Sequence, residues 1–193
     1  MTPPEEQPVL RTSRLVLRPF ALSDAGMIQQ LAGDELVADT TLNMPHPYLD
    51  GMAESWILTR EAEWKSGTLV AFAIEESGEL RGTISLRLAP AHRRAETGYW
   101  IGRAWWGRGF ATEAVCAILD FAFDQLKLNR VEATHFTRNP ASGRVMEKAG
   151  MTREGLHRER FLKNGRFEDV VQYAILATDA RVPILRPRAG GPA

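Results

Sequence analysis

The sequence predicts a single α/β (α+β) domain in which helices flank a twisted, mixed but mostly antiparallel sheet. Segments with the two-residue period of strands alternate with segments of helical period in a mixed order. The 193 residues fall within the length of one domain and suffice to bury a core. We place the domain at residues 9–178 and expect residues 1–8 and 186–193, which are rich in Pro and Gly, to be flexible tails.

The N-terminal third predicts one strand and two helices. Leu15 and Leu17 lie two residues apart between the polar neighbours Arg14 and Arg18, which indicates a strand. Ser23 is a candidate N-cap for a first helix that ends at Gly33, and Asp50 for a second helix that ends at Gly67. One face of the second helix is apolar and consists of Ala53, Trp56, Ile57 and Trp64.

Three consecutive strands are predicted next, at residues 69–75, 80–88 and 96–101. A short turn at residues 77–79 joins the first two. In the middle strand apolar and polar residues alternate, which is typical of a half-buried antiparallel strand. Its apolar side consists of Ile84, Leu86 and Leu88.

A helix and a further strand follow, with core residues in the helix at helical spacing: Val115, Ile118, Leu119, Ala122 and Leu126. The next strand is predicted at residues 130–136. A strand, a crossover helix and another strand favour parallel pairing, so the otherwise antiparallel sheet should change direction here. We expect the sheet to be splayed at this point and to leave a slot.

The C-terminal part predicts a hairpin region. Residues 152–157 and 167–176 have strand character, and Asn164-Gly165 between them is a tight-turn sequence.

A glycine turn at residues 105–114, WWGRGFATEA, leads from the predicted strand into the predicted helix. Gly107 and Gly109 allow the backbone to bend tightly and to approach a ligand closely. The first helical turn offers amide N–H groups without intrahelical partners, and the helix dipole adds positive charge there. The turn can therefore hold a phosphate or pyrophosphate, or it can simply connect strand and helix.

Two standard nucleotide motifs do not fit this turn. A Walker loop needs Lys followed by Ser or Thr after its second glycine, and no Lys is present. For a dinucleotide fingerprint, Thr112 lies where the third small residue is required, and Glu132 lies at a suitable distance for the acidic residue. Its glycines, however, follow the strand directly, whereas residues 102–106 intervene here.

A second motif lies about thirty residues downstream, at residues 139–151, NPASGRVMEKAGM. It predicts a short helix with Asn139 as N-cap, Pro140 at the first helical position and Gly150 at the left-handed C-terminal position. Together the two motifs resemble the acetyl-CoA site of the GNAT superfamily of N-acetyltransferases. The family pattern Gln/Arg-x-x-Gly-x-Gly/Ala is matched by residues 106–111, with Trp106 in place of Gln or Arg.

The resemblance extends from about residue 11 to residue 176 and is closest to the RimJ/RimL type, which acetylates ribosomal-protein N-termini. Residues 11–20, RTSRLVLRPF, are similar to the opening strand of that type. Residues 95–101, AETGYWI, resemble its fourth strand, and the segment with Asp169 and Tyr173 its last strand.

The resemblance implies acetyl-CoA as cosubstrate, without a metal. It implies that the glycine turn cradles the pyrophosphate, that Asn139 contacts the pantetheine arm and that the backbone of residues 99–101 lies along it. The implied cofactor-binding residues are Tyr99, Trp100, Ile101, Trp106, Gly107, Arg108, Gly109, Phe110, Ala111, Thr112, Asn139 and Ser142.

Three residues are candidates for proton transfer. Glu96 begins the strand that leads into the slot and could accept the proton of the attacking amine, or it could be an exposed strand-end charge. The usual GNAT general acid is a tyrosine seven residues after the motif asparagine, where this chain has Met146. Ser142 resembles the serine of the ribosomal branch that serves this role, or its hydroxyl bonds backbone at the helix start. Tyr173 is a weaker candidate.

Composition excludes several classes of protein. Lys plus Arg and Asp plus Glu number 24 each, so we expect neither nucleic-acid nor membrane binding. The lone Cys116 cannot form an intrachain disulfide, and we expect it to be a small buried hydrophobe. Without a signal peptide or a membrane span, a cytoplasmic protein is expected. The four histidines lack metal-ligand spacing; His135 is expected to line the sheet.

The predicted reaction is direct acetyl transfer from acetyl-CoA to a primary amine, with the N-terminal α-amine of a protein or peptide as the preferred acceptor. A small amine, such as an amino acid, polyamine or antibiotic, is the rival acceptor. A regulator that binds acyl-CoA without turnover is the rival from another class. We expect a monomer or a homodimer.

Overall fold

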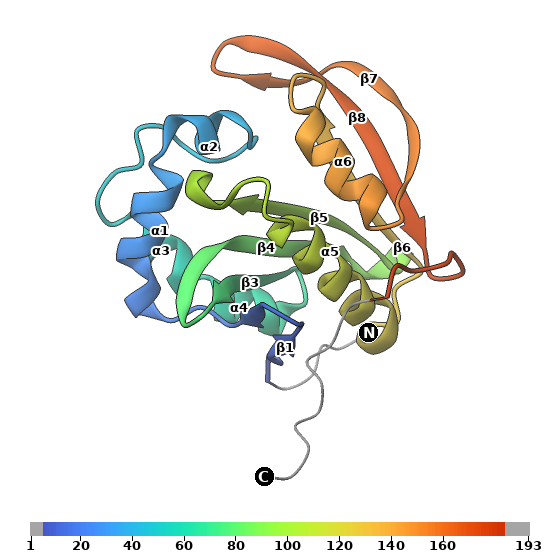
Figure 1. Ribbon diagram of the computed structural model, residues 1–193, viewed down its shortest axis with the longest axis horizontal. Helices are drawn as coiled ribbons and strands as arrows, with labels where there is room; N and C mark the ends of the chain where they lie inside the picture. Colours follow the sequence, from blue (N-terminus) through green and yellow to red (C-terminus); the bar gives the residue numbers. More distant parts are fainter. Residues whose placement is uncertain (1–5, 184–193) are drawn as a thin grey trace.

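An eight-stranded sheet organises the computed structural model, which describes residues 6–183 (Figure 1). The strand order is β1-β2-β3-β4-β5-β6-β8-β7. Adjacent strands are antiparallel except β5 and β6, which are parallel. The strands are β1 Leu10–Arg11, β2 Val16–Arg18, β3 Leu69–Glu76, β4 Glu79–Ala89, β5 Arg94–Ile101, β6 Arg130–Phe136, β7 Thr152–Lys163 and β8 Arg166–Leu176. The predicted mixed, mostly antiparallel sheet is confirmed.

Helices cover both faces of the sheet. The α-helices are α1 Ala25–Ala32, α2 Glu35–Asp39, α3 Met52–Leu58, α4 Arg60–Ser66, α5 Phe110–Asp120 and α6 Pro140–Lys148, and α5 continues as a π-helical turn, η4, at Phe121–Gln125. The main core joins α5 and α6 to one face, on which β3 places Phe72. A second core joins α1 and α3 to the opposite face, on which β3 places Ala73. Because strand side chains alternate, a single strand serves both cores.

The helix starts near the N-terminus differ from the prediction. A 3₁₀ turn, η1 at Leu22–Asp24, precedes α1, and the residue that organises this start is Asp24 rather than Ser23. The Asp24 carboxylate accepts hydrogen bonds of 2.8 Å from the Ala21 amide and from both terminal nitrogens of Arg18. Burial opposes its ionisation, but these bonds outweigh burial and lower the pKa of Asp24. Gly33 ends α1, as predicted.

The predicted helix from Asp50 to Gly67 is two helices, α3 and α4, which meet at Thr59. The residue before α3 is Gly51, with a left-handed φ of 81°, while the Asp50 carboxylate instead accepts a bond of 2.5 Å from Gln29. Gly67 ends α4 in the left-handed conformation, as predicted. Helix α2 was not predicted. Asp34 caps its N-terminus, because its carboxylate accepts a hydrogen bond of 2.9 Å from the Leu36 amide.

The sheet is splayed between β5 and β6, as predicted. Only residues 94–96 of β5 pair with β6, in parallel with residues 130–132. Beyond them the remainder of β5 pairs only with β4, and the remainder of β6 pairs only with β8. The sheet therefore consists of two halves that are joined along three residue pairs and separate from there on.

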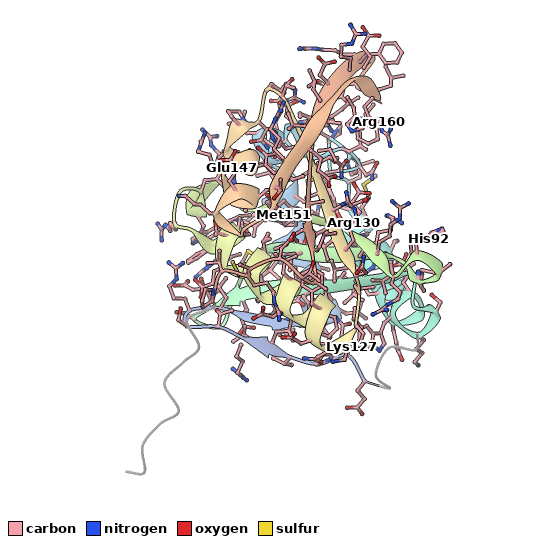
Figure 2. The ribbon with its side chains drawn as sticks, turned by 90° about the vertical axis from the view of Figure 1, so that its right-hand side faces the viewer. His92, Lys127, Arg130, Glu147, Met151 and Arg160 are labelled. Atoms are coloured by element: carbon pink, nitrogen blue, oxygen red, sulfur yellow. The ribbon has the colours of Figure 1, made fainter. Side chains whose placement is uncertain are left out.

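The C-terminal hairpin extends further than predicted, because β7 continues to Lys163. Asn164 and Gly165 form its turn with left-handed φ values of 49° and 77°. Figure 2 places Arg160 toward the outer end of this hairpin and Arg130 near its base. The register of β7 shifts between 157 and 161, where the Glu159 amide donates to the Asp169 carboxylate at 2.7 Å.

Both predicted tails lie largely outside the described residues, and only 6–8 of the N-terminal one are described. The Gln7 side chain donates to the Ala71 carbonyl of β3 at 2.7 Å. Cys116 is buried, as predicted, and burial raises the pKa of its thiol to about 11. Among residues 6–183, no helix combines the length and apolar character that crossing a membrane requires.

Candidate functional site

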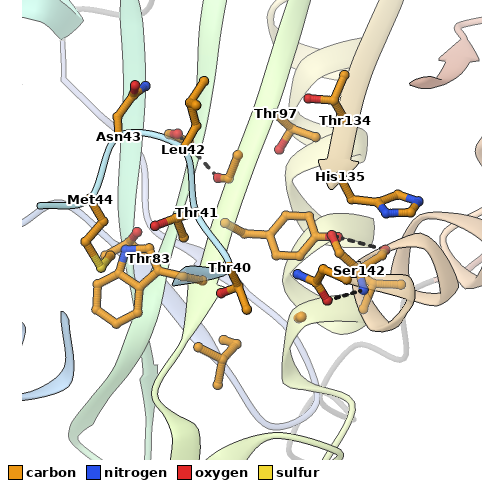
Figure 3. A pocket seen from close by; sticks show the side chains of 18 of the residues that line it. Thr40, Thr41, Leu42, Asn43, Met44, Thr83, Thr97, Thr134, His135 and Ser142 are labelled. Atoms are coloured by element: carbon orange, nitrogen blue, oxygen red, sulfur yellow. Dashed lines mark hydrogen bonds between the residues drawn. The ribbon is translucent and has the colours of Figure 1, made fainter. Parts of the chain in front are cut away.

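A cavity of about 800 Å³ lies along the splay of the sheet. Residues from β5, the glycine turn, the first turns of α5 and α6, and the loop after α2 line it; Figure 3 shows the central part. Every predicted site residue lines this cavity except Arg108, whose side chain is exposed. Residues that are far apart in the sequence are thus brought together as the two motifs predict.

The glycine turn has the backbone conformation that its sequence predicts. Gly107 and Gly109 have left-handed φ values of 77° and 81°. Phe110 is the first residue of α5, and no side chain caps this helix end. The first amides of α5 therefore have no side-chain acceptor, which leaves them available to a bound anion.

Arg14 braces this turn and was not among the predicted site residues. Its Nη1 donates to the Arg108 carbonyl at 3.0 Å, and its Nε donates to the Glu113 carboxylate at 2.7 Å. The guanidinium also lies 5.0 Å from the centre of the Phe110 ring. Glu113 accepts a further bond of 2.6 Å from Thr12, so the start of α5 is tied to the N-terminal strands.

Strand β5 divides the cavity, because its side chains alternate between the two faces of the sheet. Tyr99 pairs with Ile84 of β4 and packs against the main core, on the side of α5 and α6. Trp100 packs against the second core, on the side of α1 and α3. Thr97 consequently lies on the same face as Tyr99, and Glu96 lies on the same face as Trp100.

The side chain of Tyr99 spans the splay and meets Ser142, which Figure 3 labels on α6. Its hydroxyl lies 2.9 Å from Ser142 Oγ and donates to the Ser142 carbonyl at 3.2 Å. Burial raises the pKa of Tyr99 to about 12, although the bond to Ser142 acts in the opposite direction. The phenol is therefore protonated at neutral pH. The sequence analysis assigned Tyr99 only a backbone role, so this pair is new.

The N-terminus of α6 is capped by residues of its own segment. Asn139 Oδ1 accepts from the Ser142 amide at 3.3 Å, and Pro140 follows without an N–H group. Met146 is only 1% exposed and packs into the main core, so it does not reach the cavity. Tyr173 donates to Glu147 at 2.9 Å and does not line the cavity. Its position therefore does not support a role as the general acid.

Glu96 lies on the face of the sheet opposite to the Tyr99–Ser142 pair. It is exposed, lines the cavity and stands opposite Arg87 in the pairing of β4 and β5. It is also the last residue of β5 that pairs with β6. A carboxylate at this point can accept a proton from a group that enters the splay from the second-core side.

The loop after α2, residues 40–45, closes the cavity on that side. Arg138, next to Asn139, fixes the loop by an ion pair with Asp39 and a bond of 3.0 Å to Glu168 on β8. Lys163 is buried, as Glu168 is, and donates to the Leu42 carbonyl at 3.4 Å. The contacts to Asp39 and Leu42 join segments 99 and 121 positions apart, and no pattern in the sequence marks them.

His135 lies in the sheet, on β6, as expected; it is buried and packs against Gly143 of α6. Its Nδ1 lies 2.8 Å from the Phe136 carbonyl, and a Cβ on Gly143 would lie 2.7 Å from its Nε2. Within residues 6–183, His, Cys, Asp and Glu side chains form no group of three or more that could hold a metal ion.

Comparison with known proteins identifies the family: the chain belongs to the GNAT acetyltransferases, because residues 14–152 match the acetyltransferase (GNAT) domain. The N-acetyltransferase YoaA of Bacillus subtilis is 35% identical over 173 residues, which are 88% of this chain and 97% of YoaA. The L-amino acid N-acetyltransferase AaaT of Escherichia coli is 27% identical over 165 residues, 84% of this chain and 98% of AaaT. The protein is therefore an acetyltransferase.

Among solved structures, Mycobacterium smegmatis RimJ in complex with CoA-disulfide has the same fold, with a TM-score of 0.81. It is 28% identical in sequence, and the match covers 92% of this chain and 90% of RimJ. The suspected RimJ/RimL type thus has a structural counterpart, whereas AaaT is named for a small acceptor.

Proposed function

We propose that this acetyltransferase transfers the acetyl group of acetyl-CoA directly to the N-terminal α-amine of a protein or peptide. In this proposal the cofactor occupies the side of the cavity that faces α5 and α6. The acceptor amine approaches from the side of α1 and α3, past the loop at residues 40–45. The two substrates meet in the splay between β5 and β6.

The glycine turn supports the cofactor half of the proposal. Left-handed Gly107 and Gly109 bring the backbone close to the cavity, and the uncapped start of α5 offers amides, including those of Ala111 and Thr112, to the pyrophosphate. We assign the pantetheine arm to the backbone of residues 99–101 and to Asn139. Acetyl-CoA supplies an acyl group activated as a thioester. RimJ, which has the same fold, was solved in complex with CoA-disulfide, and this supports a cofactor of the CoA type.

The observation that carries the acceptor assignment is the charge of the cavity wall. The acidic lining residues within the described range are Glu63 and Glu96, and each has an arginine beside it. Glu63 pairs with Arg60 at 2.8 Å, and Glu96 faces Arg87 across the strand pair. A polyamine carries several positive charges and would require an acidic wall. A peptide N-terminus brings a single charge and a neutral backbone.

The amine itself makes the α-amine the easier acceptor. Its unperturbed pKa of about 7.7 to 8.0 lies well below the value of about 10.4 for lysine, so much more of it is nucleophilic at neutral pH. A weak, exposed base is then sufficient. We assign that role to Glu96, directly or through water.

The departing thiolate requires a proton or a hydrogen bond. We assign this role to the Ser142 hydroxyl, with Tyr99 bonded to it at 2.9 Å as the buried proton source behind it. The GNAT family has a tyrosine at the position of Met146. In this chain the Tyr99 phenol on β5 thus serves in place of that tyrosine. Base and acid lie on opposite faces of β5, so the proton leaves and arrives on opposite sides of the reacting carbon.

A competition experiment tests the acceptor. Peptides with a free N-terminus are compared with the same peptides blocked at the N-terminus but carrying lysine, and CoA release is measured through its thiol. We expect faster turnover on the free N-termini. Faster turnover on the blocked peptides would exclude the α-amine assignment.

A free amino acid is the second candidate acceptor. Arg87 is exposed on the cavity wall beside Glu96 and could pair with the carboxylate of an amino acid. AaaT is named for such acceptors, and the match with this chain covers 98% of AaaT. In the same assay, turnover on free amino acids that is lost when the carboxylate is amidated would favour this candidate over the peptide.

A further inference from the structure

Thr97 has a buried hydroxyl without a protein partner. The residue is 4% exposed, and its Oγ1 has no hydrogen-bond partner within the part of the chain that the structure describes. Thr12 is buried to the same degree, 3% exposed, but its hydroxyl donates to Glu113 at 2.6 Å and accepts from the Leu15 amide at 2.8 Å. Folded proteins satisfy buried hydroxyls, so an unsatisfied one that lines a cavity indicates a ligand atom.

The position of Thr97 identifies the closed end of the slot. Thr97 is the first residue of β5 beyond the three pairs with β6, and it lines the cavity (Figure 3). It lies on the same face as Tyr99, on the cofactor side. The glycine turn begins after Ile101, at the other end of the strand. At about 3.3 Å per residue, Thr97 is about 13 Å along the strand from Ile101.

The chemistry at the closed end follows from the shape of acetyl-CoA. Its pantetheine arm is linear, with the pyrophosphate at one end and the thioester at the other. If the pyrophosphate lies on the glycine turn, the acyl end lies toward Thr97. The acyl group offers a carbonyl oxygen, which accepts hydrogen bonds, and a methyl group, which forms none. A hydroxyl that lacks a partner can donate to that oxygen.

We propose that Thr97 Oγ1 donates a hydrogen bond to the acyl carbonyl oxygen of acetyl-CoA. As the amine nitrogen bonds to the carbonyl carbon, the π electron pair moves onto this oxygen, and the hydroxyl stabilises the charge that develops there. When the carbonyl re-forms, the carbon–sulfur bond breaks, the sulfur keeps the electron pair, and the amine proton goes to Glu96 or water. The inference rests on the proposed use of acetyl-CoA and adds a residue to it.

Two substitutions of Thr97 test the contributions of its hydroxyl and its methyl group separately. Thr97→Val keeps the shape and removes the donor, so we expect kcat to fall by roughly 10²-fold. Thr97→Ser keeps the donor and removes the methyl group, so we expect most of the activity to remain. Since Val replaces an unsatisfied hydroxyl, the melting temperature should stay the same or rise. The matched control for stability is Thr12→Val, which should lower it.

Binding provides a readout besides turnover. Calorimetric titration should show that Thr97→Val weakens acetyl-CoA binding by roughly 3- to 10-fold, the size of one hydrogen bond, and leaves CoA binding unchanged. CoA is the appropriate control because it lacks the acyl oxygen. A packing defect would weaken both ligands alike.

Three negative outcomes are distinguishable. If wild-type protein releases CoA with an amine acceptor and Thr97→Val matches it in kcat and in both affinities, the role of Thr97 is overturned while the proposed function stands. If Thr97→Ser is as impaired as Thr97→Val, the methyl group matters and the hydroxyl assignment is overturned. If wild-type protein acetylates no amine, the proposed function itself fails.

Discussion

Helices α5 and α6 both begin at the slot, but their N-termini are built differently. The residue before α5 is Gly109, with a left-handed φ of 81° and no side chain to accept from the first amides. The residue before α6 is Asn139, whose side chain accepts from the Ser142 amide, and Pro140 removes a further donor. Helix α5 thus starts with amides that no side chain satisfies, whereas at the start of α6 a side chain accepts from one amide and a proline takes the place of another.

This difference explains how two similar helix starts can serve different steps of the proposed reaction. The open start of α5 suits an anion, since amides and the helix dipole act together there. The closed start of α6 has less to offer a phosphate, but it holds the Ser142 hydroxyl against Tyr99. We therefore assign cofactor binding to α5 and proton transfer to α6, and each assignment can be tested separately.

The largest effect is expected at the start of α5. In Gly109→Val a β-branched residue would be forced into a left-handed backbone, with its Cβ 3.4 Å from Arg14 Nη2. We expect acetyl-CoA affinity to fall by up to roughly 10²-fold, because the backbone relieves about 1–3 kcal/mol of strain by moving the amides away from the anion. Calorimetric titration of the folded variant measures this loss.

Gly78→Val is the matched control. Gly78 has a φ of 83°, its Cβ would meet nothing within 4 Å, and it lies in the turn between β3 and β4. The same strain should therefore lower its stability, by about 1–3 kcal/mol, but not its affinity for acetyl-CoA. Equal affinity in the two variants would mean that the glycine turn only connects β5 to α5.

The second prediction concerns β5, the strand that carries Glu96 and precedes α5, since neither helix start provides a base. Glu96→Gln should lower kcat by roughly 10²-fold near neutral pH with acetyl-CoA affinity unchanged. Raising the pH should restore part of the rate, because more of the amine is then deprotonated. Steady-state kinetics from neutral to alkaline pH measure both effects.

Glu132→Gln is the control for Glu96. Glu132 pairs directly with Glu96 but binds Arg94 and Arg130 and does not line the cavity, so its loss should leave kcat unchanged. If Glu96→Gln instead loses acetyl-CoA affinity at constant kcat, Glu96 is structural and solvent takes the proton.

The sequence predicted those parts of the fold that depend on neighbouring residues. Alternating apolar residues gave the central strands, and Asn164-Gly165 and Gly67 adopt the left-handed conformations that such residues favour. The helix starts at Ser23 and Asp50 were wrong, because both residues are good caps in isolation and tertiary hydrogen bonds selected other arrangements. Asp24 with Arg18 decided the first of these.

The parts of the site that escaped prediction depend on distant contacts. Arg14 reaches the Arg108 carbonyl across 94 positions and Arg138 reaches Asp39 across 99, and no local pattern marks either residue. The glycine turn and Asn139 were accessible because each carries its own backbone signature. Tyr99 lies within a predicted strand, but its partner is 43 positions away, so only the folded chain reveals the pair.

The smallest effect is expected at the start of α6. A thiolate is a good leaving group, since a thiol has a pKa of about 8.5, so the loss of its proton donor should cost only roughly 10-fold. We expect Ser142→Ala to slow the single-turnover rate by that factor and Tyr99→Phe to act through the same step. Because burial holds the pKa of Tyr99 at about 12, its ionisation should cause no loss of rate in the wild-type protein at neutral and mildly alkaline pH.

The double variant decides whether the two hydroxyls act as a unit. If Tyr99 works through Ser142, Ser142→Ala with Tyr99→Phe should be no slower than the slower single variant, since coupled residues are not additive. Rapid quenching at saturating acetyl-CoA isolates the chemical step from product release. A normal single-turnover rate in Ser142→Ala would remove α6 from proton transfer, and the difference between the two helix starts would then concern only the binding of the cofactor.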